Sequence, residues 1–296
     1  MSGCETCPDL TGWSGLQDQI GAGEGHPFGF SFLSSNYCVP GRCCRQLNVQ
    51  GQDLAMLPEI KLMGDVDVAA SPLLRGMVMT VSYAETQGGI GLTAMNRKFV
   101  HWAAVHFDWP GYSSDDLYSI NKVLNEADMP PLLVVRDMLK HLRLLRRRKD
   151  VLVPTQRGRD FLARPQAFFD LIATDYLYAY IHHGQTQEAV RNRMRWWHVF
   201  LNLISMKAET GCSLDDLANE LYPSESYPEP AEMTVETWAE RSALRYDIIR
   251  PLCWLGLLHE EREGLTIWQH GTYHKTPLWP ACLKLESDMH SEFILH

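Results

Sequence analysis

Apolar positions at helical spacing predict three consecutive helices in the middle of the chain. The first helix begins at Arg97 and ends before Pro110-Gly111, a pair that disfavours further helix. A serine at 113 or 114 is placed to cap the second helix, whose apolar side chains recur at i, i+3 and i+7. The third helix starts near Pro131, a residue suited to a first turn, and its apolar positions continue to Leu142.

A β-hairpin is predicted directly after the third helix. Two short apolar runs, at 144–145 and 151–153, are separated by a charged turn, and Thr155 is placed to cap a short helix after them. The preceding part of the chain shows no such order. Residues 1–50 are rich in glycine and have no sustained period, and residues 51–92 have short apolar runs broken by Gly and Pro. We therefore expect an irregular N-terminal region.

Short matches indicate that the helix and hairpin order occurs twice. Ser113-Ser-Asp-Asp-Leu117 matches Ser213-Leu-Asp-Asp-Leu217. Leu142-Arg-Leu-Leu145 matches Leu255-Gly-Leu-Leu258 at an offset of 113 residues, and Gly158 matches Gly271 at the same offset. The first of these matches has an offset of only 100 residues. A Pro- and Glu-rich insertion at 223–230 accounts for the increase to 113. The second copy would have helices at 195–204, 215–221 and 238–253, and a hairpin at 257–268.

Three helices, a Leu-x-Leu-Leu strand, a charged turn, a second strand and a Thr-x-x-Gly helix start resemble the winged helix–turn–helix. The first copy is also similar to a region of uncharacterised bacterial proteins. The resemblance implies a mainly α fold with small β-hairpin wings, built as tandem winged-helix-like modules. The expected division is an irregular Gly- and Cys-rich region (1–92), a basic first module (93–164), a connecting helix (165–190) and an acidic second module (191–296).

The distribution of charge changes what the composition suggests about partners. The chain has a net charge of −9, which argues against a nucleic-acid partner if the charge is spread evenly. It is not: residues 136–164 hold 10 Lys/Arg and 3 Asp/Glu, whereas residues 209–296 hold 6 and 16. A compact basic block in an acidic chain indicates an anionic partner for that block alone.

The basic block supplies candidate nucleic-acid contacts. Arg136, Lys140, Arg143 and Arg147 are spaced i, i+4, i+7 and i+11, which would place them on one face if the third helix extended that far. The candidate set is completed by the turn and the next helix: Arg146, Arg148, Lys149 and Arg157. Cations in this arrangement suit the phosphate backbone, because each one releases condensed counterions. A solvated helix face is the alternative.

Base reading is not expected, because the start of the third helix (129–135) offers no Arg, Lys, Asn or Gln. The wing of the second module, 259–264, is acidic and would repel phosphate. The sequence therefore predicts a DNA-associated or regulatory protein that binds nucleic-acid backbone through its first module. The alternative is a protein-interaction adaptor whose basic residues contact an acidic protein surface.

Other chemistry is less strongly indicated. Cys4, Cys7, Cys38 and Cys43 could supply four thiolates to a structural zinc ion, or could be unpaired thiols. We find no nucleophile elbow, phosphate-binding loop or dinucleotide fingerprint, so no catalytic residue is expected and an enzyme is not the favoured class. There is no signal-peptide pattern and no apolar run of about 18 residues, so we expect a cytoplasmic protein without a membrane partner.

Overall fold

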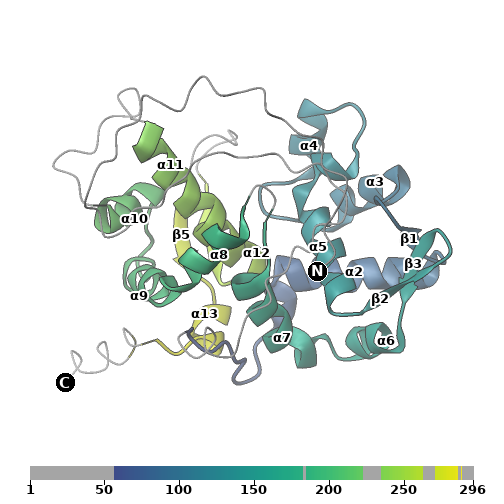
Figure 1. Cartoon of the computed structure of the whole chain (residues 1–296), viewed down its shortest axis with the longest axis horizontal. Helices are drawn as coiled ribbons and strands as arrows, with labels where there is room; N and C mark the ends of the chain where they lie inside the picture. Colours follow the sequence, from purple (N-terminus) through teal and green to yellow (C-terminus); the bar gives the residue numbers. More distant parts are fainter. Residues whose placement is uncertain (1–56, 183–184, 223–234, 263–270, 286–287, 289–296) are drawn as a thin grey trace, which may run out of the picture. The chain divides into compact units, whose positions relative to one another are not determined.

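The computed structural model describes residues 57–182, 185–222, 235–262, 271–285 and 288. In these ranges the chain is mainly helical, with one three-stranded and one two-stranded antiparallel sheet (Figure 1). This confirms the expected mainly α chain with small hairpins. None of the helices in the described ranges has the length and apolar character needed to cross a membrane.

The first half of the described chain contains the six predicted helices and strands, together with one helix, α2 (Pro72–Thr86), and one strand, β1 (Ile90–Gly91), that were not predicted. In chain order the elements are α2, β1, α3 (Arg97–His106), α4 (Ser114–Ile120), α5 (Pro130–His141), β2 (Leu145–Arg148), β3 (Val151–Pro154) and α6 (Gln156–Ala163). The three predicted helices, the hairpin and the short helix after it are thereby confirmed. The predicted caps are present as well: Ser113 accepts from the Asp116 N–H, and Thr155 accepts from the Gly158 N–H.

Helix α2 lies in the stretch that we expected to be irregular. Ser71 caps it by accepting a hydrogen bond from the Leu74 N–H, and Pro72 occupies the first turn, where no N–H is needed. The helix packs against α5, β3 and α6, so it belongs to the core of the first half, and the expected boundary at residue 92 is wrong. Its buried side chains lie on one face, with Leu73, Met77, Val81 and Ala84 at i, i+4, i+8 and i+11. Half-buried Val78 and Met79 continue the apolar run beyond that face, which obscures the stripe in the sequence.

The three-stranded sheet has the order β1-β3-β2. Strands β2 and β3 form the predicted hairpin, with Leu145 opposite Pro154 and Arg148 opposite Val151, so that only Lys149 and Asp150 make the turn. Strand β1 pairs with the other edge of β3, where Ile90 lies opposite Leu152. The hairpin is therefore held against the helices on its β3 side, and β2 is left at the edge of the sheet.

The second half follows a connecting segment. The connection consists of α7 (Phe169–Thr174) and a π-helical turn, η4 (Asp175–Ala179). The elements after it are α8 (Gln187–Met194), α9 (Trp197–Lys207), α10 (Leu214–Leu221), α11 (Val235–Ala243), the π-helical turn η6 (Leu244–Ile249), α12 (Arg250–Leu255), β4 (Leu258–Glu261), β5 (Thr272–Lys275) and α13 (Leu278–Cys282). The three predicted helices of this half are present, the third as α11, η6 and α12 in succession.

The second hairpin differs from its prediction. Its return strand is β5, at 272–275, and not the predicted stretch that ends at 268. Gly271 therefore directly precedes a strand, whereas Gly158 lies inside α6, so the match between these two glycines is wrong. Cys212 pairs with Tyr273 of β5 in an isolated bridge, which places a third segment beside this hairpin as β1 lies beside β3.

Several backbone contacts recur in the two halves. The N–H groups of Arg143 and the next residue donate back into the last turn of α5, and those of Gly256 and the next residue close α12 in the same way, 113 residues later. The Thr155 hydroxyl donates to the carbonyl of Arg143, and the Thr276 hydroxyl donates to that of Gly256. The predicted offset of 113 thus places equivalent residues at the helix end and the first hairpin strand.

Helix α12 is buried where the halves meet. Residues 251–255 are all buried, and α12 packs against α2. A side chain at Gly256 would place its Cβ 2.8 Å from the Ser71 Cα, and the Trp254 ring lies 5.4 Å from that of Trp109 in the first half. The α12 part of the segment that corresponds to α5 in the second half is therefore covered.

Candidate nucleic-acid interface

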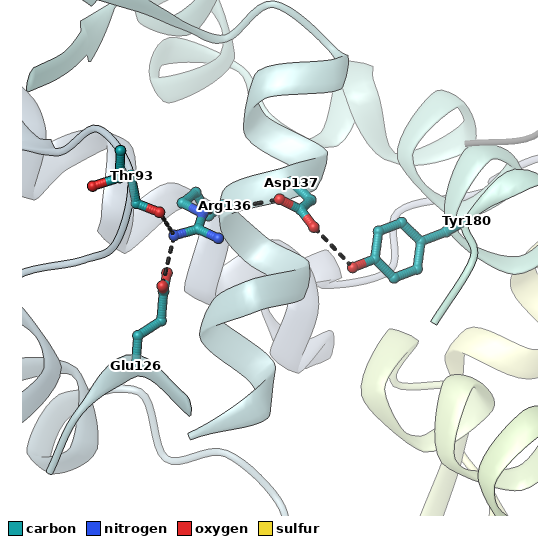
Figure 2. Close-up of polar contacts among 5 residues, drawn as sticks. All are labelled: Thr93, Glu126, Arg136, Asp137 and Tyr180. Carbon is teal, nitrogen blue, oxygen red and sulfur yellow. Dashed lines mark hydrogen bonds and ion pairs between the residues drawn. The ribbon is translucent and has the colours of Figure 1, made fainter. Parts of the chain in front are cut away.

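Arg136 does not face solvent as predicted. Its side chain is 11% exposed and its Nη1 donates to Glu126 Oε2 at 2.6 Å and to the Thr93 carbonyl at 2.8 Å (Figure 2). Burial raises the pKa of Glu126, and the Arg136 guanidinium opposes that shift. Figure 2 also shows Arg136 beside Asp137, whose other oxygen accepts from the Tyr180 hydroxyl. Arg136 is an internal ion-pair partner, and we remove it from the candidate interface.

The predicted four-residue helical stripe is also wrong in its length. Helix α5 ends at His141, and Leu142 begins the turn that closes it. Lys140 is exposed in the last helical turn, Arg143 is exposed just beyond it, and Arg147 lies in β2. The cations are therefore carried by three consecutive features: a helix end, a turn and a hairpin.

The hairpin separates its arginines onto two faces. Side chains alternate along a strand, so Arg146 and Arg148 share one face of β2 and Arg147 takes the other. All three are exposed, as is Lys149 at the turn. The Arg147 Nε donates to the Lys149 carbonyl at 3.0 Å, which fixes that side chain along the turn. An exposed edge strand with three arginines and a lysine offers cations on both faces.

Arg157, near the start of α6, completes the cationic group. Its side chain is exposed, and its guanidinium lies 5.8 Å from the Phe168 ring centroid. We call seven residues the basic wing surface: Lys140, Arg143, Arg146, Arg147, Arg148, Lys149 and Arg157. They are exposed, and within the described part of the chain none of them forms an ion pair.

Some Lys and Arg side chains outside the basic wing surface do form ion pairs with carboxylates. Within the described residues, six Lys or Arg side chains contact a carboxylate: Arg136, Arg159, Lys207, Arg241, Arg262 and Lys275. Arg159, only two residues from Arg157, pairs with Glu85 at 2.9 Å. Cations elsewhere, Arg245 and Arg250 among them, also lack ion pairs within the described residues, so the distinctive property of the wing is that seven such cations lie within residues 140–157. The charge of Arg157 acts on Asp175, and the other six cations repel one another.

Two members of the basic wing surface have left-handed backbone conformations. Arg143 has φ 57° and Lys149 has φ 56°; the third non-glycine residue of this kind in the described ranges is Asp108. The residue equivalent to Arg143 in the second half is Gly256, which has φ 88°. A side chain in this conformation costs about 1 kcal/mol or more. Two cations thus occupy positions that favour glycine.

The predicted gap in base recognition agrees with the packing of α5. Met129, Pro131, Leu132, Val134 and Val135 are buried in the core. The start of this helix contributes to the interior, so it offers neither hydrogen-bonding side chains nor a free apolar face.

The second hairpin carries the opposite charge. Glu260 Oε2 accepts from Arg262 at 2.6 Å, and its other oxygen accepts from the Tyr273 hydroxyl and the Gly271 N–H. Burial opposes ionisation of Glu260, but these hydrogen bonds prevail and lower its pKa. The carboxylate therefore stays charged, and its charge disfavours phosphate at β4.

The predicted zinc ligands, Cys4, Cys7, Cys38 and Cys43, lie outside the described residues. Within those residues no group of three or more His, Cys, Asp or Glu side chains is arranged to hold a metal. Cys212, Cys253 and Cys282 are buried free thiols, and burial raises the pKa of Cys212 to about 11 and that of Cys282 to about 12.

A cavity of about 600 Å³ lies where the two halves meet. It is bounded by the start of α2, the α3–α4 connection and β4, and it is lined by both charges, including Arg75, Asp115, Glu260 and Arg262. Arg75 is held by the Phe107 and Asp108 carbonyls, and Arg262 by Glu260. The charged groups of this cavity mainly hold its walls together, so we do not favour it as a reactive site.

Comparison with known proteins places the chain in a bacterial family. A family model of the Y4jL N-terminal domain matches residues 69–167, and one of the Y4jL C-terminal domain matches residues 186–277. The chain belongs to the Y4jL family. A member from Sinorhizobium fredii strain NGR234, named uncharacterized protein y4jL, is 93% identical over 203 residues, which cover 67% of this chain and 92% of that protein. No solved structure matches the chain.

The Y4jL family match supports the similarity to uncharacterised bacterial proteins that the sequence suggested. The Y4jL N-terminal domain begins at residue 69, just before α2, which agrees with including that helix in the first half. The basic wing surface lies entirely within this domain.

Proposed function

We propose that this chain is a non-enzymatic, DNA-associated or regulatory protein that binds the nucleic-acid backbone through the basic wing surface. The observation that carries the proposal is the group of seven exposed cations on the end of α5, the hairpin and α6, which form no ion pair with any residue that the structure describes. A polyanion would relieve their mutual repulsion and release counterions on binding.

The backbone conformations of Arg143 and Lys149 support the same proposal. Strained residues persist where the surrounding structure or the function demands them, and they cluster at binding sites. Here the strain holds a cation at each end of β2, at φ 57° and 56°. The second half carries glycine at the first of these positions and an acidic hairpin after it. Strain and positive charge thus occur together in one half only.

The fold supports a winged helix–turn–helix interpretation of the first half, with the hairpin as its wing and α5 as its third helix. The recurring contacts in the second half support a tandem arrangement in which the second copy has a supporting role, because α12 is covered by α2. Fold likeness alone does not determine function, so the proposal depends on the cations.

The mode of binding that we propose is contact with phosphates, without base reading. Phosphate contacts fix position and carry no sequence information. Since the start of α5 is buried, the exposed contacts come from arginine and lysine side chains on the wing. We therefore expect similar affinity for duplexes of unrelated sequence.

Fluorescence anisotropy with two unrelated labelled duplexes tests this function. The test variant is Lys140→Ala/Arg146→Ala/Arg148→Ala; the matched control is Arg191→Ala/Arg195→Ala/Lys284→Ala, three exposed cations of the second half. We expect wild type and control to bind both duplexes alike, and the test variant to lose more than about tenfold in affinity at low salt. Equal loss in the test and control variants would mean that net charge, and not the wing, determines binding.

A protein-interaction adaptor remains the second candidate, and one observation favours it. Large apolar side chains are exposed on and after α3 and α4: Val105 (64%), Ile120 (67%), Val123 (47%) and Tyr118 (38%). Exposed apolar groups near one another often mark a protein contact. If no nucleic acid binds at low salt, an acidic protein becomes the expected partner of the wing.

The zinc hypothesis stays a separate and less favoured prediction. Elemental analysis of the purified protein, compared with a Cys4→Ser/Cys7→Ser variant, tests it. One zinc per chain that is lost in the variant would support a structural metal.

A further inference from the structure

A π-helical turn places two arginines on one face of the second half. In η6 the Arg250 N–H donates to the Arg245 carbonyl, so these residues, five apart, lie one turn above each other. In an α-helix a separation of five residues would turn them about 140° apart. π-Helical turns are rare and often occur at functional sites. This turn therefore has a specific consequence, which is to align Arg245 with Arg250.

Aromatic rings frame these two guanidinium groups. The guanidinium carbon of Arg245 lies 5.3 Å from the Tyr246 ring centroid and that of Arg250 lies 4.9 Å from it. Arg250 also lies 5.1 Å from the Trp254 ring, and the Tyr112 ring from the first half lies 5.9 Å from Trp254. Stacking on rings holds guanidinium planes while leaving their N–H edges free to donate.

Among the residues that the structure describes, Arg245 and Arg250 differ from the nearby Arg241 and Arg262 in their lack of an ion pair with a carboxylate. Arg241 pairs with Asp215 and Arg262 with Glu260, but within the described residues neither Arg245 nor Arg250 forms an ion pair. Asp247 is nearby, and its Oδ1 accepts from the Gln185 side chain at 2.5 Å. Its charge acts on both Arg250 and the buried Arg193. This one carboxylate is therefore shared between two arginines.

Hydrogen-bond donors in the same place are buried without acceptors. Among the described residues, Arg250 Nε, Arg193 Nε and the Tyr176 hydroxyl each have no hydrogen-bond partner. Arg193 is 4% exposed and Tyr176 is 0% exposed, and Tyr176 belongs to η4, the other π-helical turn. A buried donor without an acceptor costs about 1–3 kcal/mol, and three donors in one cluster call for an acceptor that the described part of the chain does not supply.

We infer that the junction of η6 and α12 is a binding site for an oxyanion of the phosphate kind, held by Arg245 and Arg250 beside Tyr246, Tyr176 and Tyr112. Tyr246 is 43% exposed, so the site reaches the surface. Guanidinium groups recognise phosphate and carboxylate oxygens in pairs, which suits two arginines aligned by one turn. The inference is independent of the basic wing surface, which lies in the other half.

Isothermal titration calorimetry with inorganic phosphate tests the site, with chloride used to hold ionic strength constant. We expect saturable binding by wild type, and a loss of at least about tenfold in Arg245→Gln and in Arg250→Gln. Arg250→Lys keeps the charge but loses the fork, so it should bind with intermediate affinity. Arg191→Gln, an exposed change on the helix that carries Arg193, should bind as wild type does.

Several results would overturn the inference. One is no saturable binding by wild type at 20 mM phosphate. Another is an equal loss in Arg191→Gln and Arg245→Gln, which would indicate a general effect of net charge. A third is a loss confined to the Lys140/Arg146/Arg148 variant, which would place the anion on the wing. Because Arg245 is not buried, its Gln variant should fold even if Arg250→Gln does not, and circular dichroism checks this.

Discussion

Replacing Arg143 with glycine should stabilise the protein while weakening its nucleic-acid binding. Arg143 is exposed, forms no ion pair in the described ranges and has φ 57°. A left-handed conformation costs a non-glycine residue about 1–2 kcal/mol, and the greater freedom of glycine in the unfolded chain offsets about 0.5–1 kcal/mol of that gain. The expected net gain is about 0.5–1 kcal/mol.

Arg143→Ala is the matched control, because it removes the same charge but keeps the strain. The opposite change, from glycine to a residue with a side chain, can be made at the equivalent position in the second half. At Gly256, φ is 88° and an added Cβ would lie 2.8 Å from the Ser71 Cα, so Gly256→Ala combines strain with overpacking. We expect Gly256→Ala to destabilise the protein by about 2–4 kcal/mol.

Urea unfolding followed by circular dichroism measures these differences, and a gain of about 1 kcal/mol corresponds to about 2–4 °C in Tm for a chain of this size. Arg143→Gly should be more stable than Arg143→Ala. Both variants should bind duplex more weakly than wild type, and to a similar degree. If glycine proves no more stable than alanine at this position, the strain does not exist and its link with function fails.

Three further predictions concern the internal contacts. Arg136→Met should cost about 3–5 kcal/mol in urea unfolding, because it leaves Glu126 buried without its partner, and Arg136→Met/Glu126→Leu should recover much of this; a cost below 1 kcal/mol for the single variant would contradict the ion-pair role. Ser213→Ala should cost about 1 kcal/mol at pH 7 and raise the pKa of Asp216, which hydrogen bonds from the Ser213 N–H and hydroxyl now lower. The Asp216 contribution is present above its ordinary pKa and is lost as pH falls through the lowered value, so the variant should lose less stability on acidification, and NMR titration of Asp216 checks the shift. Burial of Cys212 and Cys282 should make both thiols slow to react with iodoacetamide at pH 8 until urea is added, and mass spectrometry showing rapid native labelling of either would refute that burial.

Local patterns identified the elements whose signals lie in their own residues. Ser113, Thr155 and Ser213 were predicted as caps or match points from sequence and do cap helices, because a cap needs only a side chain and an N–H two or three residues away. The first hairpin was found because its charged turn interrupts two apolar runs. Helix α2 was missed although its buried residues follow helical spacing, because half-buried apolar residues beside them obscure the stripe. The position of β5 was missed because it depends on pairing across a long connection.

The sequence predicted which cluster of cations forms the candidate site, but not which of these cations are exposed. The block of charge identified the wing, and seven of its eight proposed residues are exposed. Arg136 could not be separated from them by spacing, since its partner Glu126 lies in a different element, ten residues earlier. The junction of Arg245, Arg250 and Tyr176 had no sequence signal, because a π-helical turn and contacts between distant segments create it.

The salt dependence of duplex binding tests the central claim most directly. If all seven residues of the basic wing surface contact phosphates, log K against log salt should have a slope of up to about −6, and Lys140→Ala/Arg146→Ala/Arg148→Ala should flatten it by about 2–3. The control variant Arg191→Ala/Arg195→Ala/Lys284→Ala should keep the wild-type slope. A slope near zero for wild type, or one that the wing substitutions leave unchanged, would contradict the proposal that the wing binds the nucleic-acid backbone.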